Sequence, residues 1–433
     1  MQPELQLYAL RMKSFHSCYI IAEPAAPRDP PPPSKCRGEK NHRTAYNEKH
    51  AYRYKGELMS PRKPVIEEID YLRGFAFLAV VMQHVVGHYA FEPKLQLADG
   101  VLLGILLMLA KFAVPLFIFI TGLVLFYNYD SGVAYGPFLR KRSRDILLPY
   151  LPWAVLYAFI VMGGSAFSSW EGLQKFGRLL FTGEASYHLW YIVMTFQLYL
   201  LFPLLRKAVL WLDRRAGRSG AALLVFGGLL YVWYAGHHSL VDETMIGLRI
   251  PVLSDLFGEY RDRNSWYFLY YFVLGAAAGL YLPRWKEWIV RWHYVIIAAY
   301  AAVNLYLLYR IVSHFELHPE LVMRYNDTFL VQPHMAVFLI VSVLAMHAMS
   351  IRFGNLAPAR LKRLIKQAGS YSYTAYLAHA LVLQAAVWAA DLTAPAASVI
   401  VRSVLSFLLC AAGSVGAAML LRRAAQAWQK RRA

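Results

Sequence analysis

An arginine and a histidine lie eleven residues apart, at Arg73 and His84, in a stretch that is otherwise mostly apolar. Because an α-helix turns by about 100° per residue, this spacing returns to within about 20° of the same face. An ionisable side chain inside an apolar span is costly and usually points to a functional interior. The guanidinium could bind an anion, and the imidazole, which titrates near neutral pH, could move a proton.

The same two residues also have a structural interpretation. A snorkelling arginine can anchor a span at the membrane interface, and a lone histidine is more often a packed, hydrogen-bonded residue. The rise from Arg73 to His84 is about 16 Å, half of a hydrocarbon core about 30 Å thick. We therefore place Arg73 at the cytoplasmic mouth of the span and His84 near its midplane. Their shared face favours a functional role over the structural one.

A second polar face is predicted in an apolar stretch near the C-terminus. Ser372, Tyr376 and His379 are spaced by four and three residues, so they lie on one side of a helix. If this span runs outwards, His379 reaches nearly the depth of His84. The face either joins neighbouring helices or lines a cavity, and the sequence leaves both open. His188, at the start of another span, is slightly better explained as an interfacial anchor.

Basic residues gather between two apolar stretches, at Arg140, Lys141, Arg142 and Arg144. The positive-inside rule expects such a cluster in any cytoplasmic loop. Arginine also offers a planar fork of donors that matches phosphate oxygens. The cluster is therefore either a topology signal or a phosphate-binding site.

Five segments together resemble the membrane acyltransferase-3 family, and they occur in the family's order. The first holds an arginine, ten residues and then a histidine, which Arg73 and His84 match. The resemblance covers about residues 66–421, and the matching segments are Glu68–His84, Phe112–Leu123, Phe138–Tyr150, His188–Ile192 and Ser370–His379.

This resemblance implies an integral membrane O-acyltransferase. It would move an acyl group, with acetyl expected, from cytosolic acyl-CoA to a hydroxyl of a cell-surface or lipid-linked glycan. His84 would act as general base or carry the acyl group covalently, with His379 as a further catalytic residue. Arg73 would orient the site or bind donor phosphate, together with Arg140, Arg142 and Arg144. No metal is expected.

The composition requires elements that lie in a membrane. Hydrophobic residues make up 58% of the 433 residues and charged residues 16%. Soluble domains are nearer 45–50% apolar and about 25% charged. We expect an all-α bundle of about ten transmembrane helices, each of roughly 20 residues. The predicted spans are 70–90, 110–129, 147–166, 188–205, 221–237, 265–283, 293–312, 333–351, 370–390 and 397–421.

Loop charges orient this bundle in the cell membrane. With both termini in the cytoplasm, the inner loops and tail hold 22 Lys and Arg, and the outer loops hold 7. This asymmetry is what the positive-inside rule requires. The basic loops also explain the net charge of +19. The expected partner is therefore the lipid bilayer, and no binding to nucleic acid is expected.

The two ends of the chain differ from the apolar part. Residues 1–64 are polar and proline-rich, so we expect a disordered extension. Alternatively, the biological start is Met59 and the upstream residues are a translated leader. The transmembrane domain then spans 65–421, and 422–433 form a basic cytoplasmic tail.

The sequence lacks the motifs that are typical of several other classes of enzyme. It has no phosphate-binding P-loop, zinc pattern or nucleophile elbow, and its three cysteines form no metal-ligand spacing. The main alternative is a transporter or lipid flippase, for which paired broken helices and internal repeats would be typical. A third alternative is a non-catalytic scaffold, which would not need the polar faces.

Overall fold

The structure is a computed structural model that describes residues 52–54, 57–59, 63–92, 95–316 and 325–432. Helices dominate these residues. They are α2 (Glu68–Tyr89), α3 (Leu97–Ala110), α4 (Ala113–Asn128), α5 (Tyr135–Arg142), α6 (Leu148–Met162), α7 (Trp170–Thr182), α8 (Trp190–Ala216), α9 (Gly220–Gly247), α10 (Pro251–Phe257), α11 (Leu269–Leu280), α12 (Leu282–Ser313), α13 (Pro333–Leu356), α14 (Ala359–Ser370), α15 (Ser372–Thr393) and α16 (Val399–Arg432). Short helical turns join them, at η1 (Ser143–Leu147), η2 (Gly163–Phe167), η3 (Gly217–Ser219), η4 (Arg261–Arg263), η5 (Ser265–Phe268) and η6 (Asn326–Thr328).

The predicted all-α multi-pass fold is confirmed. In the described part of the chain, eight segments are long and apolar enough to cross a membrane. One of them, Trp190–Gly247, contains both α8 and α9, and Ser265–Leu280 is a shorter apolar helical segment. With α8 and α9 counted separately and this shorter segment included, the helices accommodate the ten predicted spans. Helix α3 precedes α4 at the predicted second span, and together they form one apolar segment of 32 residues, Leu97–Asn128.

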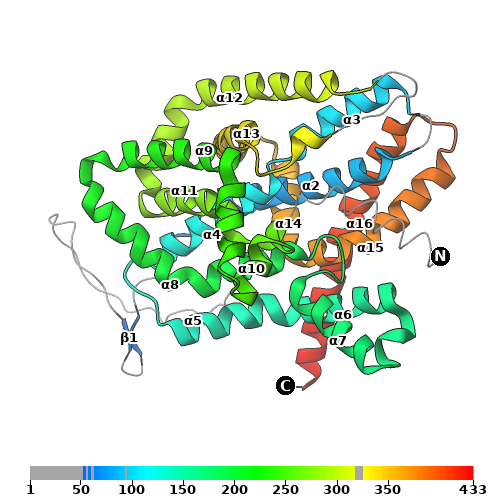
Figure 1. Cartoon of the computed structure of the whole chain (residues 1–433), viewed down its shortest axis with the longest axis horizontal. Helices are drawn as coiled ribbons and strands as arrows, with labels where there is room; N and C mark the ends of the chain where they lie inside the picture. Colours follow the sequence, from blue (N-terminus) through cyan, green and yellow to red (C-terminus); the bar gives the residue numbers. More distant parts are fainter. Residues whose placement is uncertain (1–51, 55–56, 60–62, 93–94, 317–324, 433) are drawn as a thin grey trace, which may run out of the picture.

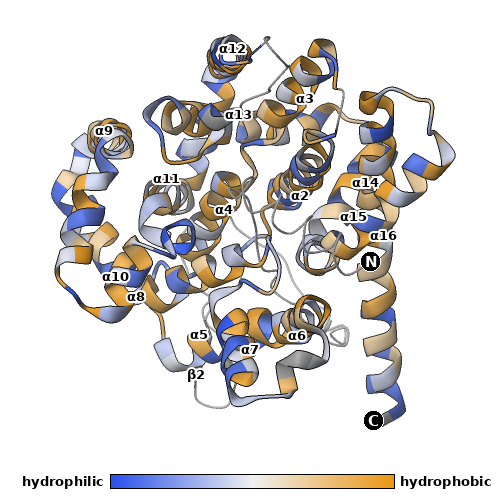
Figure 2. Ribbon diagram, turned by 45° about the vertical axis from the view of Figure 1, so that its right-hand side comes forward, coloured by the Kyte–Doolittle hydropathy of each residue, from blue (hydrophilic) through white to orange (hydrophobic). Residues whose placement is uncertain are grey.

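The long helices lie side by side around α4 (Figures 1 and 2). Helix α4 packs against α11, α2 and α13, and α2 packs in turn against α14, α15 and α16. In Figure 2, α9 and α12 are seen nearly end-on at the edge of the bundle. Their outward faces carry large apolar side chains, among them Val225, Leu229 and Leu305, each more than 60% exposed. Such faces suit contact with lipid tails.

Glycines let the two central helices approach closely. A Cβ added to Gly275 of α11 would clash with the carbonyl of Phe119 on α4, and one added to Gly279 would clash with Leu123. Gly122 of α4 meets the carbonyl of Phe272 in the same way. Small residues four positions apart are a common means of packing helices in membranes. The α4–α11 contact therefore depends on Gly122, Gly275 and Gly279.

The N-terminal part contributes little to the described structure. Strands β1 (Tyr52–Tyr54) and β2 (Glu57–Met59) form an antiparallel hairpin, in which Tyr52 pairs with Met59. Residues 1–51, 55–56 and 60–62 lie outside the described residues, so the disordered extension and the start at Met59 stay predictions.

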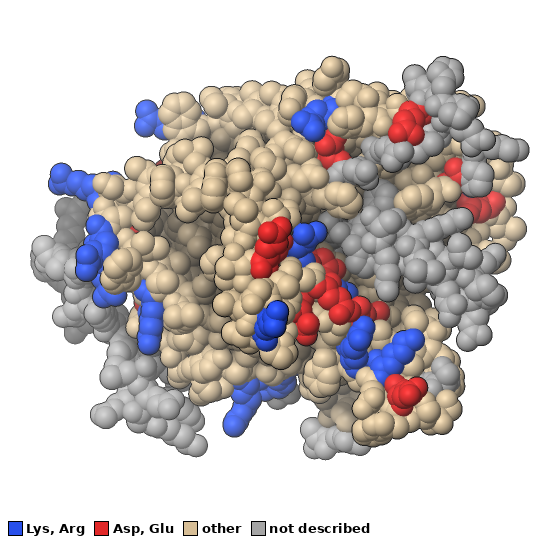
Figure 3. Space-filling view, viewed as in Figure 1, with Lys and Arg blue, Asp and Glu red and all other residues tan. Residues whose placement is uncertain are grey.

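Charge is distributed unevenly between the two ends of the bundle. In Figure 3, the edge on the left, where α8 turns into α9, shows mainly Lys and Arg. The centre and right of the same face show both signs of charge. An end rich in basic residues is expected to face the cytoplasm. The cytoplasmic position of both termini stays a prediction.

Candidate active site

Three histidines from distant parts of the chain meet inside the bundle. His84 lies on α2, His379 on α15, and His188 in the turn before α8. The rings of His84 and His379 stack, with centroids 5.1 Å apart and planes inclined by 25°. His188 meets His379 edge-on at 4.7 Å. His188 and His379 are fully buried, and His84 is 8% exposed. The structure thus brings the two predicted catalytic histidines, His84 and His379, together.

Tyrosine rings surround this histidine cluster, which consists of His84, His188 and His379. Tyr187 packs edge-on against His84 at 4.6 Å and against His188 at 5.4 Å. Tyr376 and Tyr157 pack against His188 at 4.9 and 5.1 Å. These rings exclude water from most of the site, which strengthens electrostatic interactions inside it.

Hydrogen bonds fix the orientation of the cluster. The Nδ1 atom of His379 bonds to the backbone carbonyl of Tyr376. A carbonyl only accepts, so Nδ1 carries the proton and the basic lone pair of the neutral ring lies on Nε2. The Nδ1 atom of His188 lies 3.0 Å from the hydroxyl of Ser186, and the Tyr376 hydroxyl donates to the His188 carbonyl. His379 is therefore prepared to accept a proton at Nε2.

The helices around His84 are also tied together. Gln83, its neighbour on α2, donates from Nε2 to the Ala110 carbonyl at 2.6 Å. This carbonyl ends α3, and residues 111 and 112 then break the helix before α4. On the other side, the Cys410 thiol of α16 lies 3.6 Å from the His379 carbonyl. The cluster is thus held by α2, α3, α15 and α16.

Arg73 lies on α2 as predicted, about three turns from His84. Its side chain is buried, and Nη1 lies 3.9 Å from Asp70 Oδ1. A rise of about 16 Å separates it from the histidine cluster. Arg73 therefore belongs to the N-terminal end of α2 and not to the group of imidazoles.

The predicted basic cluster is divided in the structure. Arg142 is buried, and its guanidinium lies 5.5 Å from the Phe138 ring and 5.3 Å from the Tyr199 ring. Arg140 is exposed, and Arg144 is exposed beside Asp145, with a separation of 3.6 Å. Between Arg142 and Arg144 the chain enters η1, a π-helical turn that begins at Ser143. Only Arg142 faces the bundle.

The π-helical turn also connects the basic residues to the site. The Tyr373 hydroxyl, on α15, donates to the Ile146 carbonyl of η1 at 2.6 Å. Tyr373 is six residues, or about 1.7 turns, from His379 on the same helix. Helix α15 thus contacts η1, the turn that follows Arg142, and also carries His379 of the histidine cluster.

The interpretation of His188 as an interfacial anchor was wrong. Its side chain is fully buried and contacts His379. The reason is that α8 begins only at Trp190, and the preceding turn folds into the bundle. Irregular backbone can lie at such depth only where protein surrounds it. One signal was available, because His188 begins one of the five family-like segments.

The site shows no arrangement for a metal ion. Among the residues that the structure describes, no group of three or more His, Cys, Asp and Glu side chains is arranged to hold one. The imidazoles of the cluster pack through their ring faces and edges instead.

Comparisons with known proteins identify the family of the chain. The model of the acyltransferase-3 family, described as an acyltransferase domain, matches residues 66–423. The chain is 25% identical over 238 residues to a Bacillus subtilis (strain 168) protein named "Putative membrane-bound acyltransferase YfiQ". That match covers 54% of this chain and 62% of the relative. No solved structure matches the chain. Because the family model spans nearly all of the membrane part, the chain is a multi-pass membrane protein that belongs to the acyltransferase-3 family.

Proposed function

We propose that the protein is a cell-membrane O-acyltransferase that uses cytosolic acyl-CoA, with acetyl-CoA as the expected donor. The acceptor would be a hydroxyl of a cell-surface or lipid-linked glycan. The observation that carries the proposal is the buried contact between His84, His188 and His379, which joins three distant segments of a family of acyltransferases.

In the proposed reaction, His84 removes the proton from the acceptor hydroxyl. The oxygen then attacks the thioester carbonyl, the carbon–sulfur bond breaks, and an ester and coenzyme A are formed. The thiolate of coenzyme A takes up the proton that His84 received. A second route passes the acyl group through a His84 nitrogen before the acceptor attacks.

The stacked His379 would share the proton with His84. Its Nε2 lone pair is basic because Nδ1 is bonded to a carbonyl. Two imidazolium ions at a ring separation of 5.1 Å would repel each other strongly in a buried site. The pair would therefore hold one proton at a time, which suits a base that must release its proton in each cycle.

Arg73 and Arg142 are the best-placed groups for the donor phosphates. Both side chains are buried; Arg73 lies on α2, which carries His84, and Arg142 ends α5, which packs against η1 and α8. The Nε of Arg142 is buried and has no hydrogen-bond partner among the described residues. Arg140 and Arg144 are exposed and would attract the donor from outside the bundle.

The test uses purified full-length protein in lipid nanodiscs. Release of free coenzyme A from acetyl-, butyryl- and palmitoyl-CoA is measured with and without extracted surface glycans. In parallel, mass spectrometry compares O-acyl groups on glycans from deletion and parent strains. We expect release that depends on the acceptor and a loss of ester groups in the deletion strain. Unchanged glycans together with absent thioester cleavage would contradict the proposal.

A further inference from the structure

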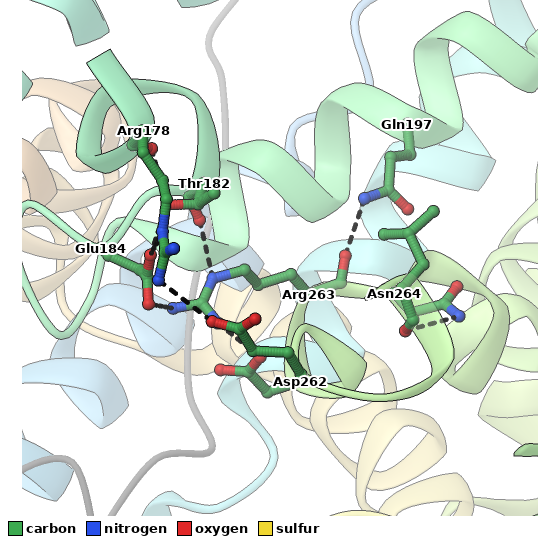
Figure 4. Close-up of polar contacts among 9 residues, drawn as sticks. Arg178, Thr182, Glu184, Gln197, Asp262, Arg263 and Asn264 are labelled. Atoms are coloured by element: carbon green, nitrogen blue, oxygen red, sulfur yellow. Dashed lines mark hydrogen bonds and ion pairs between the residues drawn. The ribbon is translucent and has the colours of Figure 1, made fainter. Parts of the chain in front are cut away.

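Arg263, in η4, is a buried arginine outside the histidine cluster (Figure 4). Its Nε donates to the Thr182 carbonyl at 2.7 Å, and one Nη donates to Asp262 at 2.7 Å. The other Nη lies 4.0 Å from Glu184. Its guanidinium also lies over the Tyr260 ring. A planar fork that reaches several acceptors at once is the particular ability of arginine.

Two partners of Arg263, Thr182 and Glu184, flank Gly183 in the turn after α7. Gly183 has a φ of 74°, a conformation that favours glycine. A Cβ at this position would lie 3.0 Å from the carbonyl group of Leu189, at the start of α8. The Thr182 hydroxyl also donates to Glu184 at 2.8 Å. The turn is therefore closed tightly, and Arg263 holds both of its sides.

The arginine is itself fixed by α8. Gln197 donates to the Arg263 carbonyl at 2.8 Å and accepts from the Ser265 amide at 3.0 Å. Asn264, between them, accepts from the Trp266 amide at 3.0 Å. Because the Gln197 side-chain amide bonds to the backbone on both sides of Asn264, α8 fixes the position of Arg263 where η4 meets η5.

We propose that Arg263 is a positioning residue that holds the Gly183 turn and so places Tyr187 and His188 against His84 and His379. The segment between the turn and α8 is six residues, Glu184–Leu189, and it contains both rings. Arg263 acts through this segment and not on the substrate. The proposal rests on the proposed function for its effect on catalysis, but its structural part does not.

The kinetic test uses Arg263→Lys, which keeps the charge and loses the fork. We expect kcat to fall at least about tenfold because a small displacement of a catalytic group is costly. The KM for acetyl-CoA should stay within about twofold, since the donor is proposed to bind elsewhere. Arg178→Lys is the matched control: its side chain is 61% exposed and pairs with the partly buried Glu184 and the exposed Glu259. Ion pairs of such an exposed arginine contribute little, so kcat should change little.

A double-mutant cycle separates positioning from general damage. If Arg263 acts through His188, Arg263→Lys should cost less than about twofold in a His188→Ala background. Equal losses of kcat in both backgrounds would overturn the proposal.

A thiol-protection assay tests the structural part without activity. Ala185 is fully buried, so a cysteine in Ala185→Cys should resist an aqueous maleimide, with labelling located by peptide mass spectrometry. Arg263→Lys should raise the labelling rate at this position, and Arg178→Lys should not. Unchanged protection overturns the inference even if kcat falls. If wild-type protein transfers no acyl group but protection is lost as expected, the proposed function fails and the positioning role stands.

A milder variant covers the case in which Arg263→Lys does not accumulate in the membrane. Glu184→Gln removes the charged partner and leaves the bond to the Thr182 carbonyl intact. It should also raise the labelling rate at position 185, but by a smaller factor than Arg263→Lys does. Protection equal to that of the parent would again count against Arg263.

Discussion

The chemistry of the histidine cluster depends on which ring nitrogens can accept a proton. For His379 the answer follows from the carbonyl bonded to Nδ1, which leaves Nε2 basic. His84 is the least buried of the three imidazoles and stands between His379 and Tyr187. This position suits the residue that meets the acceptor, with His379 behind it.

Replacing His84 by alanine tests this assignment. Loss of a general base should lower kcat by ~10²–10⁴-fold, and the affinity for acyl-CoA should change little. His88→Ala is the control, since this second histidine of α2 packs edge-on against Tyr89. Folded yield and kcat are measured separately, by size-exclusion chromatography and by coenzyme A release. A well-folded His84→Ala protein with normal turnover would end the catalytic role.

The two buried arginines should be recognised by their effect on the donor. Arg142→Lys and Arg73→Lys keep the charge but lose the fork that matches phosphate. We expect each to raise the KM for acetyl-CoA by about tenfold, which corresponds to the loss of one charge-assisted hydrogen bond. Arg140→Lys, on the exposed side of α5, should have a small effect that disappears at high salt. Equal KM values for all four proteins would identify these arginines as topology anchors.

At the scale of elements, apolar runs predicted the spans well and the intervening structure poorly. Helices α8 and α9 extend beyond the predicted spans, to Ala216 and Gly247. A run of apolar residues in the sequence does not show whether the helix continues into the polar residues that follow it. The turn that carries His188 was missed for a related reason, since burial by neighbouring helices leaves no local pattern. By contrast, the common face of Arg73 and His84 depends only on helical periodicity, and the structure keeps both on α2.

The central helix pair gives a prediction at this scale. Gly275→Leu would place a side chain against the Phe119 carbonyl and force α4 away from α11. Because backbones cannot yield as a flexible side chain can, folded yield should fall severely. Gly227→Leu on the more open α9, where the nearest atom is a flexible Tyr270 ring atom, should be tolerated far better. Fluorescence-detected chromatography of both proteins measures this, and equal yields would contradict the importance of close packing.

On the scale of the whole molecule, one end of the bundle gathers the basic groups. Lys63 pairs with Asp130 at 2.6 Å, and Arg206 donates to the carbonyls of Tyr129 and Asp130. These contacts place the start of α2, the end of α4 and the second half of α8 at the same end. Arg73, near the start of α2, belongs to that end too. The orientation of the bundle therefore decides which compartment the donor-binding arginines face.

Reporter fusions test this orientation directly. Fusions after Arg218 and after Ala433 should give cytoplasmic signals, and a fusion near Asp255 in α10 should give an external one. The physical reason is the excess of Lys and Arg in the loops assigned inside, 22 against 7. A cytoplasmic signal near Asp255 with external signals at the other two sites would reverse the bundle. Arg73 would then face away from cytosolic acyl-CoA, so the same result would also remove the proposed route of the donor.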